Sequence, residues 1–270
     1  MFNTDFQQRM HQGQLLMSTM LCKITRPFAC DVLLDLPFDF LTIDMEHAPF
    51  SDAEVADLIA VCNAARMPSV VRIPRPEWHY VTRVFDSGAS GVLAPYCETV
   101  EEVREVLRAA KLKPLKGRRA EQAIENDEYP SLATRDYLET ENAGRVVLIG
   151  IESVPAVENL DAILELQGID AVFIGPADLS ISMGIPRDFE NPDFERAMIG
   201  IIQRCSARGI PVCSNFASLE QSAKWARRGI SLIIHAADFR VLHEAYRAAL
   251  TEIATAAGRA LDIPRSTQDV

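Results

Sequence analysis

Ala171-Val-Phe-Ile-Gly-Pro-Ala-Asp178 is the stretch that decides the fold. Its first four residues are apolar and mostly β-branched or aromatic, which predicts a short strand that is buried on both faces. Gly-Pro ends the strand, because proline cannot donate a hydrogen bond to a neighbouring strand. Asp178 therefore follows the carboxyl end of a buried strand. A carboxylate at that place either caps the next helix or binds a ligand at the mouth of a sheet, and this stretch alone leaves both interpretations open.

The same pattern recurs along the chain, where short apolar segments alternate with helical ones. We predict strands at residues 14–20, 38–43, 69–74, 91–95, 145–152, 171–174, 211–216 and 231–235. This alternation indicates a parallel sheet with crossover helices. Eight units in about 250 residues favour a closed (β/α)8 TIM barrel over an open doubly wound sheet. No G-x-G-x-x-G motif follows any of these strands, so the usual mark of a dinucleotide fold is missing. The sequence predicts one α/β barrel domain over residues 1–270.

Two segments fall outside the alternation. Residues 113–144 carry a basic run followed by an acidic run, with little regular apolar period. We interpret them as an insertion after the fourth βα unit, with one or two short helices. Residues 262–270 are polar, and we predict that they form a disordered tail.

Composition narrows the class of protein. A net charge of −11 with a pI of about 5.0 argues against binding to nucleic acid or to anionic membrane surfaces. No stretch approaches the roughly 18 apolar residues that a spanning helix needs, and the polar start shows no targeting segment. The six cysteines are scattered without a C-x-x-C pair, which is typical of reduced thiols. We therefore expect a soluble, cytoplasmic protein.

Polar side chains gather where the predicted strands end. These residues are Glu46, His47, Arg72, Glu152, Asp178 and Asn215. Each alone has a structural interpretation, such as a helix cap, a loop histidine or an ion pair. A barrel, however, brings these strand ends to the face where its active sites lie. Glu152 and Asp178 follow consecutive strands, so their carboxylates can share one cation, and such a site suits Mg²⁺ or Mn²⁺ better than zinc.

Four segments carry a resemblance to a known family. They are Phe40-Leu-Thr-Ile-Asp-Met-Glu-His-Ala-Pro49, Val71-Arg-Ile-Pro74, Ile149-Gly-Ile-Glu-Ser153 and Phe173-Ile-Gly-Pro-Ala-Asp-Leu-Ser180. Together they resemble the HpcH/HpaI family, metal-dependent class II aldolases of 4-hydroxy-2-oxo acids within the phosphoenolpyruvate/pyruvate barrel superfamily. The resemblance runs from about Gly13 to Ala257 and is broken at 113–144.

The resemblance implies a set of site residues. The metal carboxylates fall on Glu152 and Asp178, the catalytic histidine on His47, the enolate-stabilising arginine on Arg72, an acid that raises the histidine's basicity on Asp86, and the backbone that binds the pyruvate carboxylate on Gly175, Pro176, Ala177 and Asp178. The chain departs from the family pattern at Gly150, where several members carry an amide side chain. It also keeps only Gly117-Arg118-Arg119 of a glycine- and arginine-containing loop, which leaves the aldehyde side of the substrate unspecified.

The chemistry of retro-aldol cleavage supports a metal site. Cleavage needs a base for the 4-hydroxyl group and a sink for the electrons of the broken bond. That sink is either a divalent metal, with Mg²⁺ or Mn²⁺ expected and Co²⁺ possible, or a lysine Schiff base. The chain has lysines only at 23, 111, 113, 116 and 224, none of them within or directly after predicted strands two to eight. We therefore favour the metal route.

Two other functions remain open at this stage. A related lyase acting on an acyl-CoA thioester or on phosphoenolpyruvate would need a basic groove, and Lys111 to Arg119 is the one basic cluster. A catalytically silent keto-acid-binding barrel is hinted at only by Gly150. The resemblance also implies a homo-oligomer, a hexamer built as a trimer of dimers, in which the long final helix from Phe239 exchanges between protomers.

Overall fold

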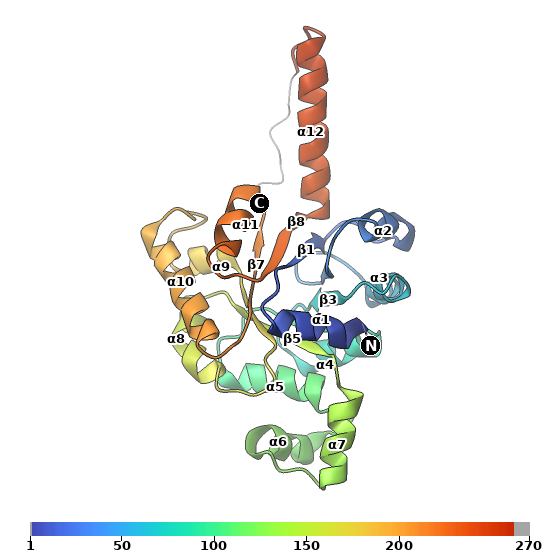
Figure 1. The fold of residues 1–270 in the computed structure, drawn as a ribbon, viewed down its shortest axis with the longest axis vertical. Coiled ribbons are helices and arrows are strands. Elements are labelled where there is room, and N and C mark those ends of the chain that lie inside the picture. The colour runs from blue at the N-terminus through green and yellow to red at the C-terminus, as the bar shows by residue number, and fades with distance from the viewer. Residues whose placement is uncertain (1, 262–270) are drawn as a thin grey trace.

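Eight parallel strands close into a barrel in the computed structural model of the chain, which describes residues 2–261 (Figure 1). The strands are β1 (Leu16–Leu21), β2 (Leu41–Asp44), β3 (Ser69–Arg72), β4 (Gly91–Ala94), β5 (Val146–Ile151), β6 (Ala171–Ile174), β7 (Val212–Phe216) and β8 (Leu232–Ala237). Each strand pairs with the next along the chain, and β8 pairs with β1. The predicted (β/α)8 fold is confirmed. The tail predicted at 262–270 lies outside the described residues.

The strands are connected and flanked by helices. The helices of the described chain are α1 (Phe2–His11), α2 (Pro27–Leu34), α3 (Asp52–Ala64), α4 (Trp78–Asp86), α5 (Val100–Lys111), α6 (Gly117–Asn126), α7 (Leu132–Glu141), α8 (Val154–Ile163), α9 (Pro176–Ser182), α10 (Pro192–Ser206), α11 (Leu219–Ala226) and α12 (Asp238–Ala256). Sequence analysis did not predict α1. Its buried Phe6 and Met10 pack against the residues inside the barrel, so this helix covers the end at which the strands begin.

Strand side chains alternate between two cores because successive residues of a strand point to opposite faces. On β5, Val146 and Leu148 belong to the core inside the barrel, whereas Val147 and Ile149 belong to the core under the helices. Continuing this alternation turns Gly150 and then Glu152 towards the inside of the barrel. The end of the strand thus places a carboxylate over the interior core.

The second strand differs from its prediction in a way that affects the site. It was predicted at 38–43 and lies at Leu41–Asp44, because the chain bends at Asp39, whose carboxylate accepts the N–H of Met17 at 2.8 Å. Asp44 is therefore the last residue of β2 and pairs in register with Arg72, the last residue of β3. Both side chains face the barrel mouth from adjacent strands.

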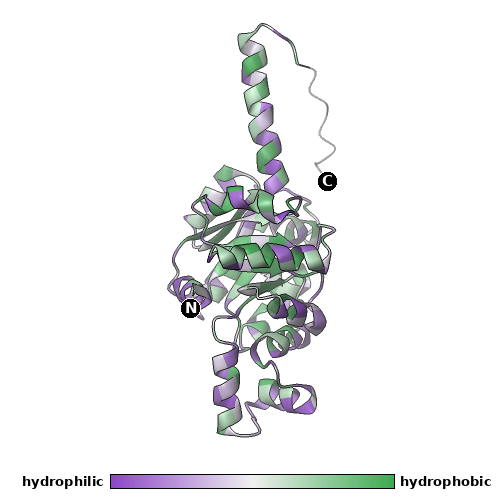
Figure 2. Cartoon of the chain, turned by 90° about the vertical axis from the view of Figure 1, so that its right-hand side faces the viewer, coloured by the Kyte–Doolittle hydropathy of each residue, from purple (hydrophilic) through white to green (hydrophobic). Residues whose placement is uncertain are grey.

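Two parts extend away from the barrel on opposite sides (Figure 1). The segment 113–144 contains α6 and α7, which share a small apolar cluster of Leu112, Ala120, Ala123 and Leu138. The other part is α12, which alternates between hydrophilic and hydrophobic bands along its length (Figure 2). No helix among residues 2–261 is both long and apolar enough to cross a membrane.

Candidate active site

The carboxyl ends of the strands bring most of the predicted residues together. Arg72 ends β3, Glu152 follows β5, and Asp178 lies in the first turn of α9 after β6. Glu152 interacts electrostatically with Glu46, Arg72 and Asp178, which places all four charges around one mouth. The site therefore combines one arginine with three carboxylates that come from different strand ends.

Arg72 is the central cation of this site. It is only 7% exposed, and its Nε and Nη2 donate to the two oxygens of Asp44 at 2.9 and 2.7 Å. Its Nη1 lies 3.1 Å from a carboxylate oxygen of Glu46. Burial alone lowers the pKa of Arg72, but the hydrogen bonds and charges of these carboxylates outweigh it, so the net shift is upward. The guanidinium of Arg72, held by a carboxylate on each side, therefore keeps a fixed orientation and stays charged.

Asp44 is a site residue that sequence analysis missed. Burial raises its pKa, but the hydrogen bonds and charge of Arg72 more than offset this, so the pKa of Asp44 is lowered overall. Its Oδ1 also accepts the backbone N–H groups of Glu46 and His47 at 3.0 and 3.4 Å. One buried carboxylate thus orients the arginine and the loop that carries the histidine. Its signal in the sequence was its two-residue spacing from Phe40 and Thr42, which share its face of the strand.

Glu152 is a buried carboxylate with few partners. It is 1% exposed, and its Oε2 accepts one hydrogen bond, from the backbone N–H of Tyr96 at 2.9 Å. Burial raises the pKa of Glu152 to about 8, and the charges of Glu46 and Asp178 add to the rise. No lysine, arginine or histidine within residues 2–261 forms an ion pair with it. A Cβ on Gly175 would lie 2.1 Å from its Oε1, so only glycine fits beside this carboxylate.

The helix-cap interpretations of the acidic residues are wrong. Gly175 is the N-cap of α9, so Asp178 is the third residue of that helix. Ser153 caps α8 and accepts the N–H of Ala156, while Ser51 caps α3. None of Glu46, Glu152 and Asp178 is therefore engaged in capping.

The donor set fits a divalent metal. Two carboxylates from consecutive strands, Glu152 and Asp178, interact electrostatically, and Glu152 is buried without a cationic partner. A buried carboxylate is costly unless a cation or hydrogen bonds compensate it. In the described part of the chain no three His, Cys, Asp or Glu side chains gather closely enough to hold a metal by themselves. Two hard oxygen ligands suit Mg²⁺ or Mn²⁺, which keep further positions for other oxygen donors.

His47 and Asn215 lie at the same end and differ in their contacts. The side chain of His47 is 62% exposed, and its Nε2 lies 3.7 Å from Oε2 of Glu46, so the imidazole faces the mouth. Asn215 donates from its amide to the carbonyls of Ile234 and Ala236 at 3.1 and 3.3 Å. The asparagine therefore holds β7 to β8, which is a structural role.

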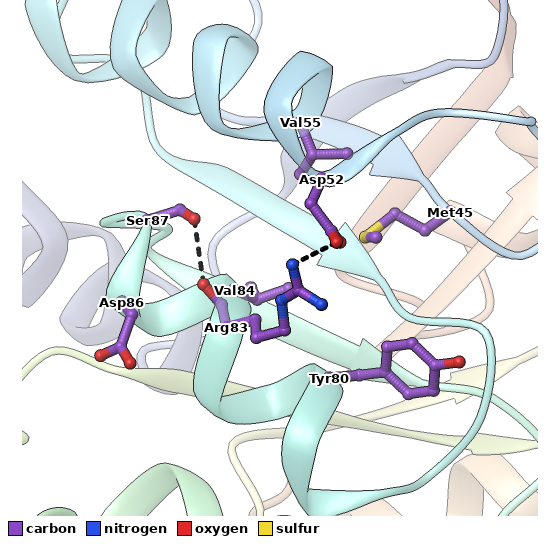
Figure 3. Close-up of a pocket in the computed structure, with 8 residues that line it drawn as sticks. All are labelled: Met45, Asp52, Val55, Tyr80, Arg83, Val84, Asp86 and Ser87. Carbon is purple, nitrogen blue, oxygen red and sulfur yellow. Dashed lines mark hydrogen bonds and ion pairs between the residues drawn. The ribbon is translucent and has the colours of Figure 1, made fainter.

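Asp86 is not brought to His47 within the chain. It is the last residue of α4, next to the start of β4, and its carboxylate forms an ion pair with Lys113. It lines a groove between α3 and α4 that has Met45 at one end and Asp86 with Ser87 at the other (Figure 3). That groove includes none of Arg72, Glu152 and Asp178. Within a single chain Asp86 therefore pairs with Lys113 and shows no contact with His47, and the expectation that it adjusts His47 stays a prediction.

Lys23 is the lysine that follows a strand at the mouth. It comes two residues after β1, and its Nζ lies 5.9 Å from the ring centroid of Phe239. Lys111 and Lys113 pair with Asp170 and Asp86, away from the site, and Lys224 pairs with Glu190. Lys23 is thus the residue against which a Schiff-base route has to be tested.

Comparisons with known proteins agree with this geometry. Residues 20–240 match the family model described as HpcH/HpaI aldolase/citrate lyase. A hydroxypyruvate/pyruvate aldolase of Paraburkholderia phytofirmans is 34% identical over 232 residues, which cover 83% of this chain and 88% of that protein. A 2-keto-3-deoxy-L-rhamnonate aldolase of Klebsiella pneumoniae is 36% identical over 191 residues, covering 68% of this chain and 69% of that protein. A solved HpcH/HpaI aldolase/citrate lyase family protein of Burkholderia cenocepacia has a TM-score of 0.80 at 30% identity and covers 93% of this chain and 99% of its own.

Proposed function

The chain belongs to the HpcH/HpaI aldolase/citrate lyase family, and from that premise we propose that it is a class II aldolase. This carbon–carbon lyase cleaves a 4-hydroxy-2-oxo acid reversibly to pyruvate and an aldehyde. The observation that carries the proposal is the barrel mouth itself, where a buried, doubly held Arg72 faces the uncompensated carboxylate of Glu152. Relatives named as aldolases of 2-keto-3-deoxy acids support the substrate class.

Each residue has a distinct task in this proposal. A divalent metal, Mg²⁺ or Mn²⁺ with Co²⁺ as a third candidate, would be held by Glu152 and Asp178 and would act as the electron sink of the cleavage. Arg72 directs its guanidinium at the 2-oxo oxygen and stabilises the enolate as it forms. His47 accepts the proton of the 4-hydroxyl group, since imidazole is the natural base near neutral pH.

The segment Gly175–Asp178 is proposed to bind the carboxylate of pyruvate. Leu179 is the first residue of α9 whose N–H finds an acceptor within the helix, the carbonyl of Gly175 at 3.0 Å. The N–H groups of Ala177 and Asp178 precede it, in the turn whose donors have no partner inside a helix. Pro176 has no N–H and fixes the start of the turn. This segment therefore offers donors beside the two carboxylates.

The alternative of an acyl-CoA lyase finds no basic groove at the site. Lys111 is bound to Asp170 and to the carbonyl of Arg145, and Lys113 is paired with Asp86. Both lie near the starts of the strands, at the opposite end from Arg72. Two members of the basic cluster that this alternative required are therefore already paired, and they lie away from the site.

We also propose a homo-oligomer that uses α12. Within this helix only Asp238 and Ala254 are buried. Large apolar side chains recur along it and are exposed, namely Val241, Leu242, Tyr246, Leu250 and Ile253. An isolated helix gains little from exposing such residues, whereas a second copy of the chain can cover them. The hexamer implied by the family resemblance is the assembly that we propose, and the mass of the native particle in light scattering tests it.

The location we propose is the cytoplasm. All six cysteines are unpaired, and Cys22 is the only one that is not buried. Unpaired thiols are typical of a reducing compartment.

A pyruvate-release screen tests the proposed function. The full chain is treated with chelator and assayed across a set of 4-hydroxy-2-oxo acids, alone and with Mg²⁺, Mn²⁺ or Co²⁺. We expect cleavage of at least one acid, abolished by the chelator and restored by metal. Borohydride with pyruvate should leave no adduct on Lys23. Full activity of verified metal-free protein, or a trapped lysine, contradicts the class II assignment.

A further inference from the structure

Tyr96 contacts both carboxylates of the proposed metal site. Its backbone N–H donates to Oε2 of Glu152 at 2.9 Å. Burial and the adjacent carboxylate of Asp178 raise the pKa of its phenol, so the phenol lies beside that second carboxylate. These carboxylates come from β5 and from the start of α9, so a single residue of the β4–α5 loop connects two other elements. The residue is 41% exposed, which places it at the rim of the mouth and not in the core.

The backbone of Tyr96 is held in an uncommon conformation. Its φ is +50°, in the left-handed region that L-residues other than Asn, Asp and Gly rarely adopt. A bulky residue keeps such a conformation only where surrounding contacts enforce it, and these residues cluster at functional sites. Here the conformation directs the N–H towards Glu152 while the phenol reaches Asp178.

Gly150 explains how the loop comes so close. The N–H of Cys97 donates to the carbonyl of Gly150 at 3.0 Å, which fastens the loop to β5. A Cβ on Gly150 would lie 2.8 Å from Cα of Pro95, 3.0 Å from the carbonyl oxygen of Ala94 and 3.0 Å from Oε2 of Glu152. Any larger residue at 150 must therefore push away the segment that carries Tyr96 and also crowd the carboxylate that this segment contacts. The missing side chain at 150 and the position of Tyr96 are two parts of one arrangement.

We infer that Tyr96 is a positioning residue that sets the spacing of the Glu152 and Asp178 carboxylates for a divalent metal, and that Gly150 is required for its placement. The inference rests on the proposed function, because it concerns the same metal. Residues that hydrogen-bond to metal ligands orient them, and their loss typically weakens metal binding. Tyr96 contacts both ligands at once, Glu152 through its backbone N–H and Asp178 through its phenol.

Manganese binding by the full chain tests the inference without relying on activity. Free Mn²⁺ is measured by electron paramagnetic resonance during titration of wild type, Tyr96→Phe, Glu152→Gln and Tyr80→Phe. Tyr96→Phe keeps the ring and the N–H but loses the hydroxyl group, and we expect the Kd for Mn²⁺ to rise about tenfold. Tyr80, on α4, lines the groove between α3 and α4, so Tyr80→Phe is the matched control and should bind as wild type does.

Gly150→Ala tests the second half of the inference. We expect it to weaken Mn²⁺ binding by a similar factor, and the double variant Gly150→Ala/Tyr96→Phe to weaken it by less than the product of the two. If Gly150→Ala does not fold, Tyr96→Phe still decides the first half, because that change removes only a hydroxyl group at the rim.

The outcomes separate this inference from the proposed function. If Glu152→Gln abolishes Mn²⁺ binding while Tyr96→Phe binds as wild type does, the role of Tyr96 is refuted and the metal site stands. If the wild type itself binds no Mn²⁺, the proposed metal and the role of Tyr96 both fail. A rise in Kd for Tyr96→Phe with an unchanged Tm supports the inference.

Discussion

Two buried carboxylates lie at opposite ends of the same barrel, and their surroundings differ. Asp170 comes just before β6 and is 3% exposed, and Glu152 comes just after β5 and is 1% exposed. Asp170 accepts hydrogen bonds from Gln7, Lys111 and the N–H of Val147, at 2.7, 2.7 and 2.8 Å, and lies 3.1 Å from Nε2 of His11. Glu152 accepts one hydrogen bond, from a backbone N–H.

The pKa shifts of the two groups have opposite signs. Burial raises the pKa of Asp170, but the hydrogen bonds and charges of His11 and Lys111 outweigh it, so its pKa is lowered overall. For Glu152 burial wins, and the pKa is raised to about 8. In a barrel of this type the end where strands begin serves stability, and the end where they finish serves chemistry. A fully satisfied carboxylate therefore holds the fold together, whereas an unsatisfied one is available to a ligand.

The largest expected effect follows from removing the unsatisfied carboxylate. Glu152→Gln should lower kcat/KM for pyruvate release by about three powers of ten or more, since a metal's stabilisation of transition-state charge amounts to several kcal/mol. Asp170→Asn is the matched control, and per folded molecule it should stay within about threefold of wild type. Initial rates at a metal concentration that saturates wild type measure both. Equal losses of kcat/KM in the two variants would contradict the proposal that only the end where the strands finish takes part in catalysis.

Arg72 and His47 are proposed to act on different parts of the substrate: Arg72 on the enolate of pyruvate and His47 on the 4-hydroxyl group. Exchange of pyruvate's methyl protons with solvent requires only the groups that stabilise the enolate. Arg72→Ala should therefore lower both cleavage and exchange by about two to three powers of ten. His47→Ala should lower cleavage severely and leave part of the exchange. Proton NMR in D₂O alongside a cleavage assay compares them.

Two controls accompany this comparison. Arg72→Ala also leaves the buried Asp44 without its ion-pair partner, which can destabilise the fold. The double variant Arg72→Ala/Asp44→Asn therefore separates a loss of catalysis from a loss of stability. Cleavage by His47→Ala at the wild-type rate would return His47 to the role of a loop histidine.

Asp170 carries the largest expected effect on stability. Asp170→Asn should lower the free energy of unfolding by about 3 kcal/mol, because it breaks a buried charge pair and weakens the tie between α1 and the barrel. Asp161→Asn is the control, since Asp161 is 59% exposed at its side chain and pairs with Arg208 at 3.2 Å on the surface. That change should cost less than about 1 kcal/mol. Urea denaturation monitored by circular dichroism measures both, and equal losses would mean that burial of Asp170 adds nothing.

The pH dependence of stability sharpens the contrast further. The folded chain keeps a proton on Glu152 up to about pH 8, whereas a glutamate with its ordinary pKa of 4.5 has already ionised in the unfolded chain. Between these values the folded state binds more protons, so the stability of the metal-free protein falls as pH rises through this window. Glu152→Gln removes that loss. With chelator present, its Tm should exceed that of wild type by a margin that grows from pH 5 to pH 9, and parallel curves would contradict the raised pKa.

The sequence predicts the barrel well because its signal is local. Eight apolar strands, each followed by a helix, are visible in the spacing alone, and so is the appearance of Arg72, Glu152 and Asp178 at strand ends. The sequence does not reveal Asp44, because the predicted strand 38–43 ends one residue before it. One residue decides whether a side chain faces the mouth.

Other features of the site depend on the three-dimensional structure. The role of Tyr96 depends on a left-handed backbone and on a glycine more than fifty residues away in the chain. No local sequence pattern therefore predicts this role. Helix α1 was missed because its few apolar residues lie among polar ones, and only the open end of the barrel gives them a partner. The role of Asp86 was predicted from the family resemblance alone. The resemblance does not predict at which end of the barrel the helix α4 places this residue.

The smallest expected effect concerns Asp86. Within one chain its carboxylate pairs with Lys113 at the end where β4 begins, so Asp86→Asn should change kcat/KM and its pH profile by less than about twofold. The side chain is 53% exposed, so the loss of the pair should cost less than about 1 kcal/mol of stability. His47→Ala provides the reference profile for a lost base.

If Asp86→Asn instead reproduces that profile, a second copy of the chain must bring Asp86 to His47. Mixed oligomers of Asp86→Asn and His47→Ala chains would then recover activity, because some of their sites combine an intact histidine with an intact aspartate from the neighbour. Without such recovery, an effect of Asp86→Asn would come from the groove between α3 and α4, which connects Asp86 to Met45 beside the histidine loop.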